Sequence, residues 1–468
     1  MYQFPRNLYT DVRIEERFDT KISFRKDKLE AQKVRRNKGA FIRVFDGSRW
    51  YYSSITDLNR IQESMDILAQ MAVPNPHISE HPVVRAFEDN QGTILRFERT
   101  SVADIPAEEK RALLESYLPL LKDPTIVHHT SYYMDNRTVK SIYSSKGVAV
   151  AFDRQICGLR FNLELSAGES RETGVVSRAT PFFENLKGLE DDFRKEIEKS
   201  IAFVTDAEPV KPGVYPVLLS PEATGVFTHE SFGHKSESDF MVGDEAMKAE
   251  WALGKTIGPE LLTIIDDGTV DGTGYTPYDD EGTKGRKNHI ITNGKLTGRL
   301  HSAATGAALG EELTGNARAV SFEFEPIVRM TTTYIQKGNR PMKDIIAEMD
   351  NGIYVETVRH GSGMSTFTMA PGRAYQIENG KIAIPVYQFY AEFALVGIVS
   401  SDGVFGFSGC GINQIVFFPF FRAVVYRVQK GTDQRIGFVL PPHNHASEIG
   451  FHGDGFEYCL IGRFQWCE

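Results

Sequence analysis

The first part of the chain carries two kinds of hydrophobic pattern. Residues 40–55 alternate between apolar and polar positions, are rich in aromatic side chains and turn at Asp46-Gly47, which together predict a β-hairpin. Two more strands are predicted within residues 139–165. Three other segments carry apolar residues on one face at helical spacing and predict amphipathic helices: 56–72, 106–122 and 184–203. We therefore expect an N-terminal α/β domain over residues 1–205.

The pattern changes after the linker-like segment 205–213, TDAEPVKPG. Many short apolar segments follow, separated by glycine, aspartate and asparagine, and a helix is predicted near residues 341–350. Two dipeptides in this part favour tight hairpin turns: Asn293-Gly294 and Asn379-Gly380. We therefore expect a β-rich C-terminal domain over residues 206–468, which gives the whole chain an α+β fold.

One stretch of the second half predicts a helix that carries reactive side chains. Ser220 is a favourable N-cap, Pro221 suits the first helical position, and Glu222 suits the positive end of a helix. The helix is expected to run from residue 221 to about residue 236. Its second half lies in FTHESFGHKSESD, residues 227–239, where two histidines bracket a glutamate.

The two histidines of this stretch, His229 and His234, are five residues apart. On a regular helix this spacing separates the side chains by about 140° around the axis, whereas the four-residue spacing of the common zinc-protease signature separates them by about 40°. Two interpretations follow. Either the histidines are unrelated, or the helix widens at Ser231–Gly233 into a π-type turn that brings them together. Gly233 tolerates such a distortion best because it has no Cβ atom.

In the second interpretation, the neighbouring residues suit a metal centre. Glu230 would act as the general base for a metal-bound water, and Glu237 and Asp239 would be hydrogen-bond partners of the imidazoles. Zinc needs a third protein ligand, for which Cys410 in SGCGINQ is a candidate because the flanking glycines let the backbone approach closely. The alternative for this cysteine is a small buried apolar residue.

Composition narrows the classes of function. Lys and Arg, 53 in all, are outnumbered by 62 Asp and Glu, and the net charge of −9 gives no electrostatic footprint for nucleic acid. No segment approaches the ~20 apolar residues of a membrane span, and the first residues carry no secretory signal. The four cysteines among 468 residues do not form a disulfide framework. We expect a soluble, cytoplasmic protein with no nucleic-acid and no membrane partner.

The segment HESFGHKSESD resembles the His-Glu-x-x-x-His signature of the TldD/PmbA family of zinc metallopeptidases, specifically its TldD branch. The resemblance continues over residues 35 to 415. FDGSRWYYSS resembles part of the family's N-terminal domain. Four blocks resemble successive parts of its C-terminal domain: YDDEGTKGRKNHIITNGKLTGRLHS, TGNARA, PIVRMTTTYI and GRAYQIENGKI.

This resemblance implies an α/β domain followed by a β-rich domain, in a homodimer or in a heterodimer with a PmbA-like (TldE-like) subunit. It implies proteolysis of small or unfolded peptides, among them leader peptides of modified bacteriocins and labile antitoxins. The family's zinc ligands correspond to His229, His234 and Cys410, and its catalytic glutamate corresponds to Glu230. An older family label, modulator of DNA gyrase, has no physical support in the acidic balance of this chain.

An extended peptide is expected to bind by adding a strand to an exposed sheet edge, because backbone hydrogen bonds give affinity without much sequence preference. The segments AYQIENGKI and RMTTTYI are candidates for that edge, with ordinary core strands as the alternative for each.

The C-terminus departs from the family pattern, with Ile412 where the family has lysine and an unfamiliar tail from about residue 436. The tail holds further side chains that bind metals: His443, His445, His452, Asp454 and Cys459. Two other functions therefore stay open. One is a non-enzymatic interaction subunit with an impaired metal site, and the other is a metal hydrolase with a non-peptide substrate.

Overall fold

The computed structural model describes residues 2–211, 213–363, 366–387, 389–394 and 416–427. Cys410 and the metal-binding side chains predicted in the tail lie outside the described residues. The described chain combines helices with several β-sheets, which confirms the predicted α+β class. Within this part of the chain, no helix has both the length and the apolar composition that crossing a membrane requires.

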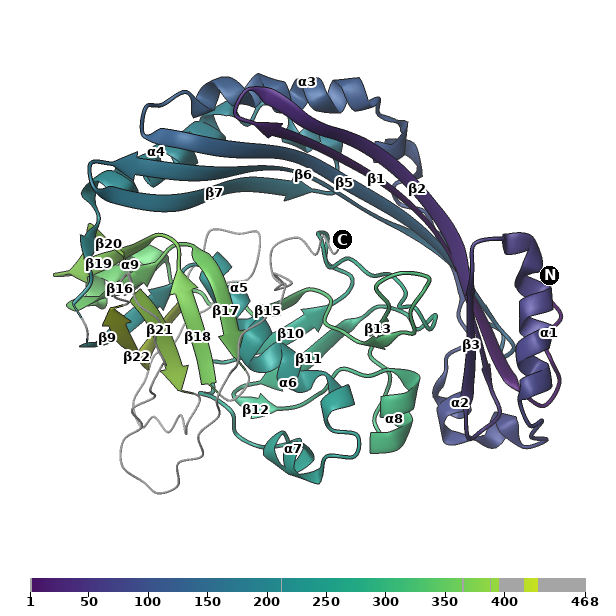
Figure 1. The fold of residues 1–468 in the computed structure, drawn as a ribbon. Coiled ribbons are helices and arrows are strands. Elements are labelled where there is room, and N and C mark those ends of the chain that lie inside the picture. The colour runs from purple at the N-terminus through teal and green to yellow at the C-terminus, as the bar shows by residue number, and fades with distance from the viewer. Residues whose placement is uncertain (1, 212, 364–365, 388, 395–415, 428–468) are drawn as a thin grey trace, which may run out of the picture.

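Seven strands form the N-terminal sheet, in the order β3-β2-β1-β5-β6-β4 with β7 paired to β6. Their bounds are β1 Tyr9–Arg25, β2 Lys28–Phe45, β3 Trp50–Ile55, β4 Gln91–Ile94, β5 Ile126–Ser144, β6 Ala149–Ala167 and β7 Ser170–Thr180. Strands β1, β2, β5 and β6 are 17 to 19 residues long. Strands of this length accumulate twist, and Figure 1 shows a curved sheet whose concave face covers the C-terminal part of the chain.

Helices α3 (Ala107–Tyr117) and α4 (Glu190–Asp206) lie on the convex face of this sheet (Figure 1). Helix α1 (Ile61–Met71) packs at the other end, against β2 and β3. The three helices confirm the helical segments predicted from apolar spacing, and their ends differ from the predictions because 3₁₀ turns precede or follow them. The β2–β3 pair, with Phe45 opposite Trp50, confirms the predicted hairpin.

Three sheets form the C-terminal part. The nine-stranded sheet has the order β17-β18-β21-β22-β9-β16-β19-β20-β8, the four-stranded sheet the order β12-β11-β10-β15, and β13 pairs with β14. The strands of the nine-stranded sheet are β8 Glu208–Pro209, β9 Gly213–Leu219, β16 Asn351–Val355, β17 Val358–Gly363, β18 Thr366–Pro371, β19 Ala374–Glu378, β20 Lys381–Tyr387, β21 Phe389–Ala394 and β22 Val416–Arg427. The other strands are β10 Ile264–Asp267, β11 Lys287–Thr292, β12 Lys295–Leu296, β13 Ala317–Arg318, β14 Ile327–Val328 and β15 Thr333–Ile335. The helices are α5 Pro221–Thr228, α6 His234–Ser236, α7 Glu245–Glu250, α8 Ala303–Leu309 and α9 Met342–Glu348.

Both predicted Asn-Gly turns of the C-terminal part are confirmed. Asn293 and Gly294 join β11 to β12 with φ of 48° and 76°, and Asn379 and Gly380 join β19 to β20 with φ of 50° and 73°. Positive φ at both central residues is the conformation of a type I′ turn, which asparagine and glycine adopt at the lowest cost. Helix α9 likewise confirms the helix predicted near residues 341–350.

The N-terminal sheet and the C-terminal part share buried polar contacts. Lys140 of β5 forms an ion pair of 2.7 Å with Asp280, and both side chains are buried. Arg13 of β1 donates hydrogen bonds of 2.9 and 2.7 Å to the carbonyl groups of Ser321 and Phe324. These contacts fix the long sheet over the C-terminal part. The domain boundary that we propose at residues 205/206 falls at the end of α4.

Candidate metal centre

The helix that carries the two histidines begins as the sequence predicts. Ser220 Oγ accepts a hydrogen bond of 3.1 Å from the backbone N–H of Ala223, and Pro221 occupies the first turn. Helix α5 and the turn that follows it contact β17 of the nine-stranded sheet and β15 of the four-stranded sheet. The histidine stretch is therefore held between two sheets, at the end of a regular α-helix.

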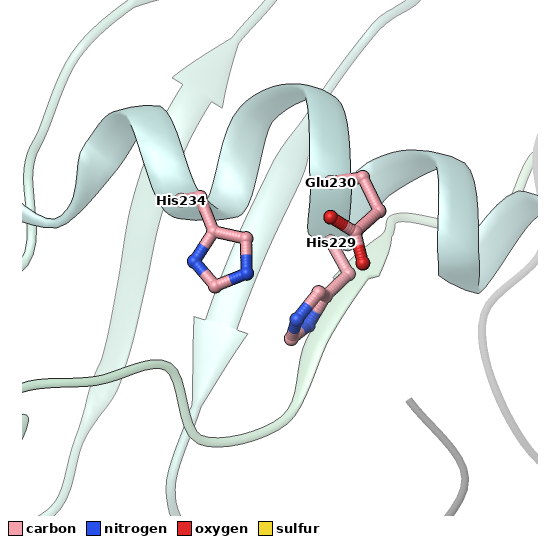
Figure 2. Close-up of side chains that lie close together, drawn as sticks. All are labelled: His229, Glu230 and His234. Carbon is pink, nitrogen blue, oxygen red and sulfur yellow. The ribbon is translucent and has the colours of Figure 1, made fainter. Parts of the chain in front are cut away.

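The helix widens into a π-helical turn at His229–Gly233, directly after α5. A π turn adds one residue per turn, so side chains five residues apart come onto one side of the helix. The ring centroids of His229 and His234 are 4.6 Å apart, and Figure 2 shows both rings projecting from the same side, with Glu230 beside His229. The structure therefore agrees with the interpretation in which the helix widens and the two histidines lie together.

Packing around the π turn explains why it forms here. Phe232 is buried in the C-terminal core and makes an edge contact with Phe227 at 5.6 Å. Met330 packs directly on Gly233, where a Cβ atom would lie 2.0 Å from the Met330 sulfur. A bulky side chain therefore anchors one residue of the turn, and a neighbouring side chain fills the space left by the glycine.

We expect Gly233→Ala to destabilise the turn by about 1–3 kcal/mol, the usual cost of overpacking, and to weaken metal binding. Thermal unfolding and zinc titration would measure the two effects. Gly225→Ala is a matched control, because Gly225 lies in α5 and a Cβ atom added there would meet no neighbour within 4 Å, and alanine there favours the helix. Equal zinc affinity in both variants would contradict a role for the glycine in shaping the turn.

The ring of His229 has a nitrogen atom that can bind a metal ion. Its Nε2 atom is buried and has no hydrogen-bond partner among the described residues. Burial, with a smaller effect from His234, lowers the pKa of His229 to about 3. The ring is therefore neutral at physiological pH, with a nitrogen that no described protein group satisfies.

His234 is held by a carboxylate. Its Nδ1 atom lies 3.0 Å from Oε2 of Glu237, which is fully buried. Burial lowers the pKa of His234, but the hydrogen bond and the negative charge of Glu237 outweigh it and raise the pKa overall. Arg329 approaches the same oxygen of Glu237 at 3.4 Å. Because Nδ1 contacts Glu237, the ring orientation is fixed and Nε2 is the nitrogen left to bind a metal.

Glu230 completes the group. Burial raises the pKa of its carboxyl, His234 opposes the shift, and Glu237 adds to it. Ligand atoms of His229, Glu230 and His234 all lie within 4.8 Å of one another. The three side chains form a group of possible metal ligands, with Glu230 beside both imidazoles.

Two other predicted site residues have different outcomes. Asp239 holds the backbone rather than an imidazole: its Oδ2 accepts a hydrogen bond of 2.8 Å from the N–H of Val328. Cys410 lies outside the described residues, and its role as third ligand stays a prediction. Sequence reasoning missed Arg329, although it belongs to the PIVRM block that carries the family resemblance.

The described residues fit a zinc ion. Neutral imidazole nitrogens are preferred zinc ligands, and a carboxylate on the other nitrogen of a liganding histidine is the usual support. Here one imidazole has an unsatisfied buried nitrogen, and the other has its second nitrogen on a buried carboxylate. Among the described residues, no protein group pairs with the Nε2 atom of His229, and an unpaired buried nitrogen costs about 1–3 kcal/mol.

Comparisons with known proteins identify the family of the chain. Residues 212–392 match the family model described as the PmbA/TldA metallopeptidase C-terminal domain, and residues 10–73 match domain 1 of the same family. A metalloprotease of Methanothermobacter thermautotrophicus is 30% identical over 385 residues, which are 81% of this chain and 83% of the relative. The chain belongs to the PmbA/TldD family.

A further relative and two solved structures are also similar to this chain. The protein named zinc metalloprotease TldD homolog of Saccharolobus solfataricus is 30% identical over 276 residues, which cover 56% of this chain and 60% of the relative. A solved Thermotoga maritima structure, whose name links it to modulation of a DNA gyrase, aligns with a TM-score of 0.72 and 18% identity. It covers 90% of this chain and 96% of its own. TldE of Thermococcus kodakarensis aligns with a TM-score of 0.67 and 15% identity, over 89% of this chain and 96% of that one. Both structural likenesses show the fold.

Proposed function

We propose that this chain is a zinc-dependent peptidase that cleaves small or unfolded peptides. The observation that carries the proposal is the π turn, which brings His229 and His234 together with Glu230 beside them. The imidazole nitrogen of His229 is buried and has no partner among the described residues, and π turns are frequent at functional sites. The names of the relatives support a metallopeptidase of the PmbA/TldD type.

In this proposal the zinc ligands are His229, His234 and Cys410. A bound zinc ion would polarise a water molecule and the scissile carbonyl group. The carboxylate of Glu230 would accept the proton of the attacking water and return it to the leaving amine, a role that its raised pKa suits. Glu237 would keep the His234 ring in its orientation throughout.

Strand addition remains our proposal for substrate binding, and the sheets distinguish the two candidate edges. Strand β19, in AYQIENGKI, lies between β16 and β20 and so has no free edge. Strand β15, in RMTTTYI, is the last strand of its sheet and contacts both α5 and the π turn. An extended peptide paired with β15 would run beside the histidines, which favours β15 as the docking strand.

We also propose that the enzyme acts in the cytoplasm and assembles with a second copy or with a PmbA-like (TldE-like) subunit. The structural likeness to TldE supports this kind of assembly. The alternative is an interaction subunit with an impaired site. Its distinguishing property is the lack of zinc in protein purified without chelators and supplied with the metal.

The experiment that tests the proposal combines zinc content with peptide cleavage. We expect about one zinc ion per wild-type chain, its loss in Cys410→Ala, and cleavage of unfolded peptides in preference to small amides and esters. Cys157→Ala is the matched control, because Cys157 is a buried thiol in the N-terminal core whose Sγ donates to the carbonyl group of Thr180. Zinc retained in Cys410→Ala would move the third ligand elsewhere, and hydrolysis of esters alone would favour the non-peptide hydrolase.

A further inference from the structure

Buried Ser238 and His301 form a Ser-His-Glu group with the partly buried Glu311, next to the end of the helix that carries His229 and His234. The imidazole of His301 has its Nδ1 atom 3.0 Å from Ser238 Oγ and its Nε2 atom 3.1 Å from Oε2 of Glu311. Arg299 donates to the other oxygen of Glu311 at 2.7 Å. The arrangement resembles the order of groups in a serine-hydrolase triad, in which an acid orients a histidine against a hydroxyl.

The hydroxyl of this group is not a nucleophile. Ser238 is fully buried and His301 is 1% exposed, so no substrate reaches either group. The Ser238 hydroxyl also approaches the carbonyl oxygen of Leu300 at 2.5 Å and donates its single proton there. The Nδ1 atom of His301 lies 3.0 Å from Ser238 Oγ and 3.3 Å from Thr305 Oγ1, so the ring is fixed between these hydroxyls and Glu311. The three residues therefore act on the position of the chain rather than on a substrate.

Ser238, which His301 contacts, is next in the chain to Glu237, the residue that holds the His234 ring. Ser236, Glu237 and Ser238 follow one another at the end of the metal-site helix. Two backbone hydrogen bonds tie this segment to Leu300: the Leu300 N–H donates to the carbonyl of Ser236 at 2.8 Å, and the Ser238 N–H donates to the carbonyl of Leu300 at 3.2 Å. The His301–Ser238 contact adds a side-chain link. Glu237 lies between Ser236 and Ser238 in the chain, and its carboxylate contacts His234 Nδ1.

We infer that His301, held by Glu311, is a positioning residue for the metal centre, because its contact with Ser238 fixes the backbone that aims Glu237 at His234. The inference rests on the proposed zinc site and extends that site to residues beyond the histidine motif. Support of this kind, one layer outside the ligands, commonly changes metal affinity by about 10- to 100-fold. We expect a change in zinc affinity at the lower end of this range, about 10-fold, because His301 acts on the metal site only through Ser238 and Glu237.

The test is the zinc dissociation constant, measured by competition with a chelator, of wild type, His301→Gln and Ser238→Ala. His301→Gln keeps a polar group that reaches towards Glu311 but loses the imidazole Nδ1, and Ser238→Ala removes the hydroxyl that lies 3.0 Å from that atom. We expect zinc to bind about 10-fold more weakly in both variants. His301→Asn, which keeps an amide near the position of Nδ1, is expected to restore part of the affinity. Ser238→Ala is the milder change and tests the inference even where His301→Gln fails to fold.

His129→Gln is the matched control for a loss of stability alone. His129 is also buried and has its Nδ1 atom 3.3 Å from a serine hydroxyl, that of Ser131, but it lies in β5 of the N-terminal sheet. We expect this variant to lower the melting temperature without changing zinc affinity. Unchanged affinity in His301→Gln and Ser238→Ala would overturn the inference while the proposed zinc site stands. Wild type that binds no zinc would overturn both.

Discussion

Replacement of Glu230 by glutamine is expected to slow peptide cleavage by about 10²- to 10⁴-fold while zinc binding is retained. Glutamine has the size of glutamate but cannot accept the proton of the attacking water, and general-base catalysis contributes a rate factor of this order. Retention of zinc is expected because the proposed ligands are His229, His234 and Cys410. The measurement is kcat on an unfolded peptide, with zinc content determined on the same preparation.

Glu245→Gln is the control for Glu230→Gln. Glu245 is an exposed glutamate on α7 that pairs with Lys248 three residues later at 3.7 Å, outside the group of metal-binding side chains. Its replacement is expected to leave kcat within a factor of about two, since surface ion pairs contribute little. A Glu230→Gln enzyme that cleaves peptides at the wild-type rate would assign the proton transfer to another group.

Alanine at His229 or His234 is expected to abolish zinc binding and, with it, peptide cleavage. Two of the three proposed ligands are nitrogen atoms of these rings, and loss of either ring leaves two protein ligands where a catalytic zinc site has three. Binding to the folded state also stabilises it, by about 2.7 kcal/mol when free zinc is 100 times the dissociation constant. Wild type should therefore melt at a higher temperature with zinc than without, and the two variants should not.

His289→Ala is the control for the histidine variants, because His289 is an exposed histidine on β11 of the same part of the chain. Its zinc content, activity and zinc-dependent melting shift should equal those of wild type. Loss of zinc from His234→Ala alone would leave His229 as a buried structural histidine. Such a result would support the interpretation in which His229 and His234 have unrelated roles.

Local chemistry explains the elements that were predictable from the sequence. Asn293-Gly294 and Asn379-Gly380 form hairpin turns because these residues adopt positive φ at little cost, whatever surrounds them. Helix α5 begins after Ser220 because a serine hydroxyl and a following proline satisfy the first turn of any helix. Each of these signals depends on a few neighbouring residues, and the sequence contains all of them.

The spacing of the histidines was predictable only as two alternatives. Five residues between His229 and His234 permit a regular helix with separated rings or a π turn with adjacent rings, and the sequence does not distinguish them. The structure adds the packing that favours the π turn: Met330 occupies the space beside Gly233, and Phe232 is buried against Phe227. Met330 is far along the chain from the motif, so no local rule could include it.

The sequence by itself determined the α+β class, the amphipathic helices, the Asn-Gly hairpins and the residue types able to bind zinc and move a proton. Only the tertiary structure decided that the helix widens, that Asp239 binds the backbone of Val328, and that His301 and Glu311 lie next to Ser238. The physical reason is the range of the interactions. Capping, turn conformation and helical periodicity act over a few residues, whereas a buried hydrogen-bond network joins groups that only folding brings within about 3 Å of each other.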